Sequence, residues 1–344
     1  MSRRTLTLAI ASLAAVAAIA VAVLFPVPYV ILTPGPTLNT LGKDSSGQPL
    51  ISITGHPTYS TSGHLNLVTI SYMGGPGTRL NIFQALRAWL APSEAVVPQT
   101  EIFPAGQSAQ ETQAQDTQQM ASSQELATAA ALSELHISYQ PQVEVLTTVP
   151  GYPASKSMKA GDVIEAVDGK PVTTPAALSS AITARPVGST LQLRVMRGTQ
   201  TLTVPVTSKA SNGTPVIGVQ VEQNYKFPFN VQITVGAIGG PSAGMMFALG
   251  IIDKLTPDNL TNGKFIAGTG EITASGQVEP IGGIQQKMVG ARDAGATVFL
   301  TPAGNCSDTV GAVPAGLKIV KVSTLSQAVS DLEAIKAGKS VPSC

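Results

Sequence analysis

The chain has 344 residues, of which 43% are hydrophobic and 4% aromatic, and its formal net charge is +1. This length is enough for two or three domains, each with its own core. The charge leaves no basic surplus for nucleic-acid binding, and two cysteines cannot build a disulfide-rich scaffold, nor a four-ligand zinc site without histidine.

The chain begins with an apolar run at residues 5–25 that no charge interrupts. About 20 apolar residues suffice to cross the hydrocarbon core as a helix. Arg3 and Arg4 precede the run, so residues 1–4 are expected to stay in the cytoplasm. The competing interpretation is a cleaved signal peptide, but Pro26 follows where a small-residue cleavage site is expected. We expect an uncleaved single-pass anchor in the cell membrane, with the bulk of the chain extracytoplasmic.

Residues 26–135 are interpreted as an extracytoplasmic N-terminal region with strands and a connecting helix. Alternation at 51–53 and 65–70 is typical of strands, and 81–90 has helical spacing. Residues 106–135 lack proline and are rich in Gln, Ala, Ser and Thr, which predicts a long helix with one modest apolar face. We interpret that helix as a connection without a functional role.

Residues 136–210 predict a compact β-rich domain. Gly161-Asp162 ends a turn before a strand at 163–167, and Asp168-Gly169 then makes a tight hairpin turn in which Gly tolerates positive φ. One helix and two further strands follow, at 175–184, 191–196 and 201–206.

This pattern resembles a PDZ domain. Such domains usually bind an extended peptide, often a C-terminus, by adding it as a strand beside a sheet edge. The carboxylate-binding loop of the family is not evident before Val143, and Ile217-Gly218-Val219 is the alternative source of that strand. We therefore assign no peptide-binding residues, and a domain that serves only for packing remains the alternative.

A serine between glycines dominates the last third of the chain. The segment Gly240-Pro241-Ser242-Ala243-Gly244 follows an apolar strand at 231–235 and precedes a helical run. Small neighbours let a substrate backbone approach, and the N–H groups at a helix start could stabilise an oxyanion. On this motif alone, a tight turn with a helix cap is an equally good interpretation.

A lysine on a second predicted helix is the candidate base. Lys287 lies beside the face that carries Ile284 and Met288. A lysine can replace histidine only if burial brings its pKa from about 10.4 to roughly 7–8. A Ser–His–Asp triad is disfavoured because all three histidines lie in the first half of the chain. We expect the alternative lysines to face solvent: Lys254, Lys264 and Lys318.

This segment resembles the proteolytic domain of Lon peptidases, in their membrane-anchored, PDZ-containing branch. The resemblance lies in three blocks and in Lys287, which falls on the catalytic lysine of the family; the blocks are Gly240–Gly244, Thr269–Thr273 and Pro280–Gly283. Many ATP-dependent relatives carry an acidic residue three positions before the serine, whereas this chain has Gly239. That departure puts an acidic gating role at this position in doubt.

The resemblance implies a Ser–Lys dyad. Ser242 would attack the peptide carbonyl, and Lys287 would act as general base and later protonate the leaving amine. The family's threonine hydrogen-bonds the lysine, and that role passes to Thr269. The nucleophile loop with its oxyanion groups would comprise Gly240, Pro241 and Ala243.

The expected protein is of the α+β class: an N-terminal transmembrane helix, a PDZ-like β-rich domain at 136–210 and a Lon-type α/β proteolytic domain at 211–344. The expected function is that of a serine endopeptidase that cleaves extracytoplasmic or membrane-associated protein segments, with the PDZ domain assisting substrate recruitment or regulation. We expect no cofactor and no metal. By analogy with Lon-type domains, a homo-oligomeric ring is a further expectation.

ATP independence is expected because no phosphate-loop motif occurs. Gly338-Lys339-Ser340 has Glu333 where the first glycine of the motif belongs. Outside the cytoplasm, Cys306 and Cys344 could pair in a disulfide, with two free thiols as the alternative.

Two rival functions remain. One is a catalytically inactive, membrane-tethered PDZ protein that binds peptides. The other is acyl transfer of the penicillin-binding type, which requires Ser-x-x-Lys; this is disfavoured because Met245 follows Ser242 at that spacing.

Overall fold

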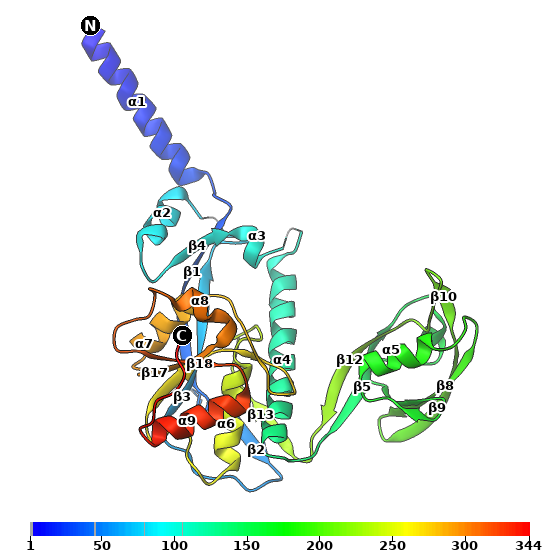
Figure 1. The fold of residues 1–344 in the computed structure, drawn as a ribbon. Coiled ribbons are helices and arrows are strands. Elements are labelled where there is room, and N and C mark those ends of the chain that lie inside the picture. Colours follow the sequence, from blue (N-terminus) through cyan, green and yellow to red (C-terminus); the bar gives the residue numbers. More distant parts are fainter. Residues whose placement is uncertain (1–2, 45, 79, 105) are drawn as a thin grey trace. The chain divides into compact units, whose positions relative to one another are not determined.

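The computed structural model describes residues 3–44, 46–78, 80–104 and 106–344, and the chain divides into two compact units (Figure 1). The first unit joins the residues up to His136 to Phe229–Cys344. The second unit is Ile137–Pro228. The chain therefore leaves the first unit once and returns to it.

A six-stranded sheet lies at the centre of the first unit, in the order β18-β17-β14-β3-β1-β4. Its strands are β1 (Tyr29–Asn39), β3 (His64–Met73), β4 (Ala95–Pro98), β14 (Phe265–Gly268), β17 (Val298–Pro302) and β18 (Lys318–Val322). The four strands from β18 to β3 run parallel, and β1 and β4 continue the sheet in antiparallel pairs. Residues 26–135 thus share a sheet with the C-terminal part of the chain. We had expected them to form a region separate from the proteolytic domain.

Helices and short hairpins complete the first unit. The helices are α1 (Arg3–Leu24), α2 (Ile82–Leu90), α3 (Gln99–Ile102), α4 (Ala109–Glu134), α6 (Gly244–Leu255), α7 (Ile284–Asp293), α8 (Cys306–Thr309) and α9 (Leu325–Lys336), with a 3₁₀ turn at Ala303–Asn305. The short strands pair as β2 (Ile51–Thr54) with β13 (Asn230–Ile233) and β15 (Glu271–Ile272) with β16 (Val278–Glu279).

Helices α6 and α7 cover opposite faces of the sheet. Ala267 of β14 packs in the apolar cluster that contains Met288 of α7. A Cβ on the next residue, Gly268, would instead lie 2.7 Å from the sulfur of Met246 on α6. Because successive residues of a strand point to opposite faces, the two helices approach from the two sides.

The second unit is a β-rich domain. Its sheet has the order β12-β5-β6-β8-β9, with β7 paired to β6. The elements are β5 (Gln140–Thr148), a 3₁₀ turn (Pro153–Lys156), β6 (Val163–Val167), β7 (Lys170–Pro171), α5 (Pro175–Thr183), β8 (Thr190–Arg197), β9 (Gln200–Thr207), β10 (Lys209–Ser211), β11 (Thr214–Val216) and β12 (Val219–Lys226). The expected boundary at residue 210 ends this domain too early, because β12 pairs along β5 from Val219 opposite Thr148.

Helix α1 corresponds to the apolar run at the start of the chain. Among the described helices it is the one that has the length and apolar character needed to cross a membrane. None of its apolar window is buried inside the protein.

Candidate active site

The loop that carries Ser242 lies between β13 and α6, and helix α4 holds it in place. Gly240 has a φ of +84°, a backbone conformation that favours glycine. Its N–H donates to the carbonyl of Asp116 at 2.9 Å, and the Ser123 hydroxyl donates to the carbonyl of Pro241 at 2.9 Å. Helix α4 therefore fixes the backbone on the approach to Ser242.

A second set of bonds fixes Ser242 from the other side. Its carbonyl accepts hydrogen bonds from the N–H of Gly270 at 2.8 Å and from the Thr269 hydroxyl at 2.9 Å. Met245 in turn donates its N–H to the carbonyl of Gly270 at 3.0 Å. The turn that follows β14 and the start of α6 thus hold each other in place.

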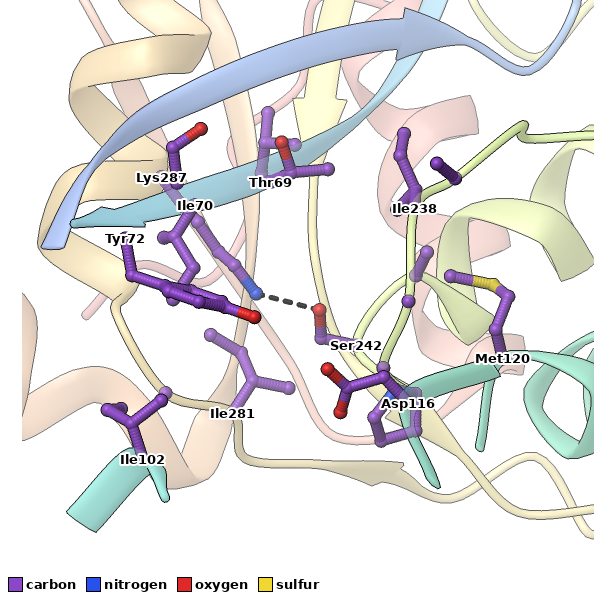
Figure 2. A pocket seen from close by; sticks show the side chains of 18 of the residues that line it. Thr69, Ile70, Tyr72, Ile102, Asp116, Met120, Ile238, Ser242, Ile281 and Lys287 are labelled. Atoms are coloured by element: carbon purple, nitrogen blue, oxygen red, sulfur yellow. Dashed lines mark hydrogen bonds between the residues drawn. The ribbon is translucent and has the colours of Figure 1, made fainter. Parts of the chain in front are cut away.

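Lys287 meets the serine hydroxyl beyond the end of β14. Its Nζ donates to the Oγ of Ser242 at 2.8 Å and to the Oγ1 of Thr269 at 3.2 Å. Figure 2 shows the contact between Lys287 and Ser242 inside the pocket. Since the Thr269 hydroxyl proton is donated to a carbonyl, its oxygen lone pairs are free to accept from the lysine.

Burial changes the acid–base behaviour of this lysine. Lys287 is only 2% exposed, and desolvation lowers its pKa to about 7, although the negative charge of Glu271 raises it in part. At such a pKa, a large fraction of the amine is neutral near pH 7. A neutral amine in hydrogen-bond contact with a hydroxyl can accept its proton.

The dyad lies at the wall of a cleft of about 430 Å³. Strand β3 contributes residues 68–72, α4 contributes Thr112, Asp116 and Met120, and Ile281 lies near the lysine. Figure 2 shows Tyr72 and Asp116 among the side chains of this cleft. Burial raises the pKa of Asp116, and burial together with the Asp116 charge raises the pKa of Tyr72.

One wall of the cleft is an open strand edge. On the side of β14, the pairing of β3 ends where Leu67 lies opposite Gly268. Residues up to Met73 continue the pairing with β1 on the other side. Within the described ranges, no strand pairs with the free side of β3 beyond Leu67.

Helix α4, interpreted from the sequence as a connection without a functional role, forms part of the cleft wall. Thr112, Asp116 and Met120 line the cleft, and their spacing of four residues places them on one helix face. That spacing is the signal in the sequence that could have identified them. Asp116 was missed because it lies among exposed Gln, Ala and Thr residues and far from the serine in sequence.

The other candidate lysines lie outside the cleft. Lys264 and Lys318 are exposed, as expected. The expectation for Lys254 was wrong: it is half-buried on α6, and burial lowers its pKa. Lys254 does not line the cleft around Ser242, so it is not an alternative to Lys287 as the candidate base.

The two cysteines are joined. Cys306 and Cys344 form a disulfide across 38 residues. The N–H of Lys321 in β18 also bonds the carbonyl of Pro342, so the end of the chain is held against the first unit at two points.

Comparison with known proteins identifies two domain types. Residues 195–333 match the family model of the Lon protease (S16) C-terminal proteolytic domain, and residues 114–207 match that of the PDZ domain. The chain therefore contains both domain types. The compact unit that corresponds to the PDZ match is Ile137–Pro228.

Several Lon proteases are similar to part of the chain. Lon protease 1 of Bacillus subtilis is 32% identical over 119 residues, which are 33% of this chain and 15% of that protein. Lon protease of Syntrophomonas wolfei is 33% identical over 136 residues, which are 37% and 16% of the two chains. The chain thus spans about one sixth of the length of these relatives.

Solved PDZ domains are also similar. The PDZ domain of an SdrC-like protein from Listeria monocytogenes is 26% identical, with a TM-score of 0.22, and the match covers 23% of this chain and 85% of that domain.

Proposed function

We propose that this chain, which carries a Lon-type proteolytic domain and a PDZ domain, is a serine endopeptidase with Ser242 as nucleophile and Lys287 as general base. One observation carries the proposal: the Nζ of a lysine that is 2% exposed lies 2.8 Å from the serine Oγ. An ordinary solvated lysine would remain protonated at neutral pH, whereas this one has its pKa lowered to about 7.

Acylation follows from this contact. The neutral Nζ of Lys287 takes the proton of the Ser242 hydroxyl as the oxygen forms a bond to the substrate carbonyl carbon. The resulting ammonium gives the proton to the leaving nitrogen as the peptide C–N bond breaks. Thr269 accepts a hydrogen bond from Nζ and so orients the amine toward the serine.

Deacylation repeats the sequence with water. Lys287 takes a proton from water as the water oxygen bonds the acyl carbon. The bond between that carbon and the Ser242 oxygen breaks, and the proton returns to the serine.

The oxyanion would be stabilised by backbone N–H groups at the start of α6. Within the described residues, the N–H groups of Ser242 and Ala243 are in no backbone hydrogen bond, unlike those of Gly240 and Gly244. Donors fixed in this way stabilise negative charge without reorganisation.

The substrate would be an extended protein segment. The free edge of β3 offers backbone donors and acceptors beside the dyad, so a flexible segment could add to it as a strand. Folded proteins cannot present such a strand without unfolding. The absence of a phosphate-loop motif in the sequence is consistent with cleavage that needs no ATP.

The PDZ domain would recruit or regulate substrates. A pocket of about 400 Å³ lies beside the edge strand β12 of its sheet. Leu178 and Ile182 of α5 line it together with Ile217–Val219. This arrangement suits an extended peptide that adds to β12 and places apolar side chains in the pocket.

Helix α1 would anchor the enzyme as a single-pass helix, with the peptidase and PDZ units outside the cytoplasm.

The test uses the full chain in nanodiscs and a fluorescently labelled, unfolded casein without nucleotide. Ser242→Ala and Lys287→Ala should each lower kcat/KM by about 10³-fold or more while the melting temperature shows a folded protein. Lys254→Ala is the matched lysine control and should retain activity, because Lys254 lies outside the cleft. Cleavage by the Lys287→Ala protein at the wild-type rate would exclude the dyad. No cleavage by the wild type would favour a peptide-binding protein instead.

A further inference from the structure

Helix α2 exposes a face of large apolar side chains. The helix begins after Asn81, whose side chain and that of Gln84 form a reciprocal N-terminal cap. Five apolar residues recur at helical spacing with exposed fractions from 41% to 76%: Ile82, Phe83, Leu86, Trp89 and Leu90. A helix on the surface of a soluble protein normally buries such an apolar face against the core.

The opposite face of α2 is small and packs on the first unit. Ala88 is fully buried, and Ala85 packs beside it against Ile31 of β1 and Val96 of β4. The helix is thus fixed by its alanines, while its large side chains point away from the core. Within the described part of the chain, the five side chains of the outer face stay exposed.

This face lies close to the end of α1. Helix α1 ends at Leu24, and Val27 already packs in the same apolar cluster as Ala88. The N–H of Val27 donates to the carbonyl of Leu80 at 2.8 Å. Val27 lies three residues after Leu24 and therefore at most about 11 Å from it, and its bond to Leu80 places the start of α2 near the end of α1. Figure 1 shows α2 at the end of the sheet where α1 joins the unit.

We propose that α2 lies in the membrane interface and inserts its outer face, Ile82, Phe83, Leu86, Trp89 and Leu90, into the extracytoplasmic leaflet. The inference rests on the proposed anchoring by α1. An α1 that spans the membrane would bring the outer face of α2 to the lipid surface. The bilayer is therefore the partner that covers this face. Phe25 and Tyr29 are exposed at the same end of the unit, and aromatic side chains favour the interface.

Docking of α2 would limit how the first unit tilts over the membrane. A single helix followed by a short link would let the unit tilt over the membrane. A second contact through α2 restricts that tilt, because α2 packs on β1 and β4 of the sheet whose strand β3 lines the cleft. The cleft is then held at a fixed height, which favours substrate segments close to the membrane surface.

The single tryptophan of the chain makes the proposal testable without labels. Trp89 is the only tryptophan, and it is 73% exposed in the protein alone. The full chain is reconstituted in phosphatidylcholine vesicles, with and without bromine on the acyl chains. Brominated lipid should quench Trp89 emission at least about twofold, and acrylamide should quench it less than free tryptophan.

Matched variants separate α2 docking from anchoring and catalysis. The double variant Leu86→Glu/Leu90→Glu should still float with vesicles and cleave soluble casein, yet lose most of the quenching by brominated lipid. Val310→Glu changes an apolar residue that is 78% exposed elsewhere on the unit and should leave the quenching unchanged.

Each outcome has one meaning. Flotation with free access of acrylamide to Trp89 would overturn the docking proposal while leaving the anchor intact. Protection from acrylamide without quenching by brominated lipid would also overturn it, since a protein partner would then cover α2. If the wild-type chain did not float with vesicles, the anchor and the docking that rests on it would be refuted. If the wild-type chain floated but did not cleave casein, the peptidase proposal alone would be refuted.

Discussion

The Cβ of Asp116 on helix α4 lies 2.6 Å from the position that a Cβ on Gly239 would occupy. Real Cβ atoms do not approach so closely, so the helix packs directly on the backbone of the loop before Ser242. The chain has glycine at position 239, and Asp116 of α4 packs against it.

Gly239→Ala is therefore expected to displace the loop and to lower kcat/KM by about tenfold or more, because small misplacements of a nucleophile reduce the rate strongly. Casein cleavage and the melting temperature measure the effect. Adding Asp116→Gly removes the clashing atom and should restore part of the activity, after comparison with the Asp116→Gly single variant. Adding Asp116→Ala keeps that Cβ and should not. Equal recovery with both second substitutions would contradict the steric explanation.

The rate should rise with pH through a midpoint near 7. In the proposed mechanism the neutral amine of Lys287 acts as the base, and the pKa of this amine is lowered to about 7. Glu271 raises that pKa by its negative charge, so Glu271→Gln should move the midpoint of kcat/KM to lower pH by roughly a few tenths of a unit or more.

Glu279→Gln is the matched control for this shift. Glu279 faces Glu271 across the β15–β16 pair, but its charge is not a cause of the Lys287 pKa shift. The control should keep the wild-type midpoint. A shift to higher pH in Glu271→Gln would contradict the assigned electrostatics.

Stability should also depend on pH through Lys287. Below about pH 7 the lysine is protonated in both the folded and the unfolded chain, and the folded state bears the full cost of a buried charge. As pH rises from about 7 toward 10.5, the folded state loses the proton first, so the free energy of unfolding increases. The gain is on the order of 5 kcal/mol for a shift of this size.

Lys287→Met removes this dependence with little change in side-chain length. Its stability advantage over wild type should therefore be largest near pH 6 and should shrink toward pH 10, as measured by urea unfolding at each pH. Lys318→Met, at an exposed lysine, is the control and should show no such trend. An advantage that grows with pH would show that the buried amine is not the cause.

The disulfide should stabilise the first unit. Cys306 and Cys344 close a loop of 38 residues, for which the chain-entropy model gives about 4 kcal/mol. Reduction, or Cys306→Ser/Cys344→Ser, should lower the melting temperature by several degrees. The reductant should have no effect on the double variant. An unchanged melting temperature of the wild type under reducing conditions would indicate that the crosslink does not contribute.

Several features followed from short stretches of sequence. The apolar run at the N-terminus, the small residues around Ser242 and the hairpin turn at Asp168-Gly169 each reflect local physics: the apolar length of a helix, the space around a side chain and the φ angle of a turn. The position of Lys287 beside an apolar helix face likewise predicted its burial, which the structure bears out.

The tertiary structure alone decided which distant segments meet. Pairing of β3 with β14 joins residues 64–67 to residues 265–268, and it leaves the free edge that forms a wall of the cleft. Helix α4 places Asp116 against Gly239 from far along the chain. Local periodicity specifies which face of an element is buried, but the partner of that face depends on how all elements pack together in space.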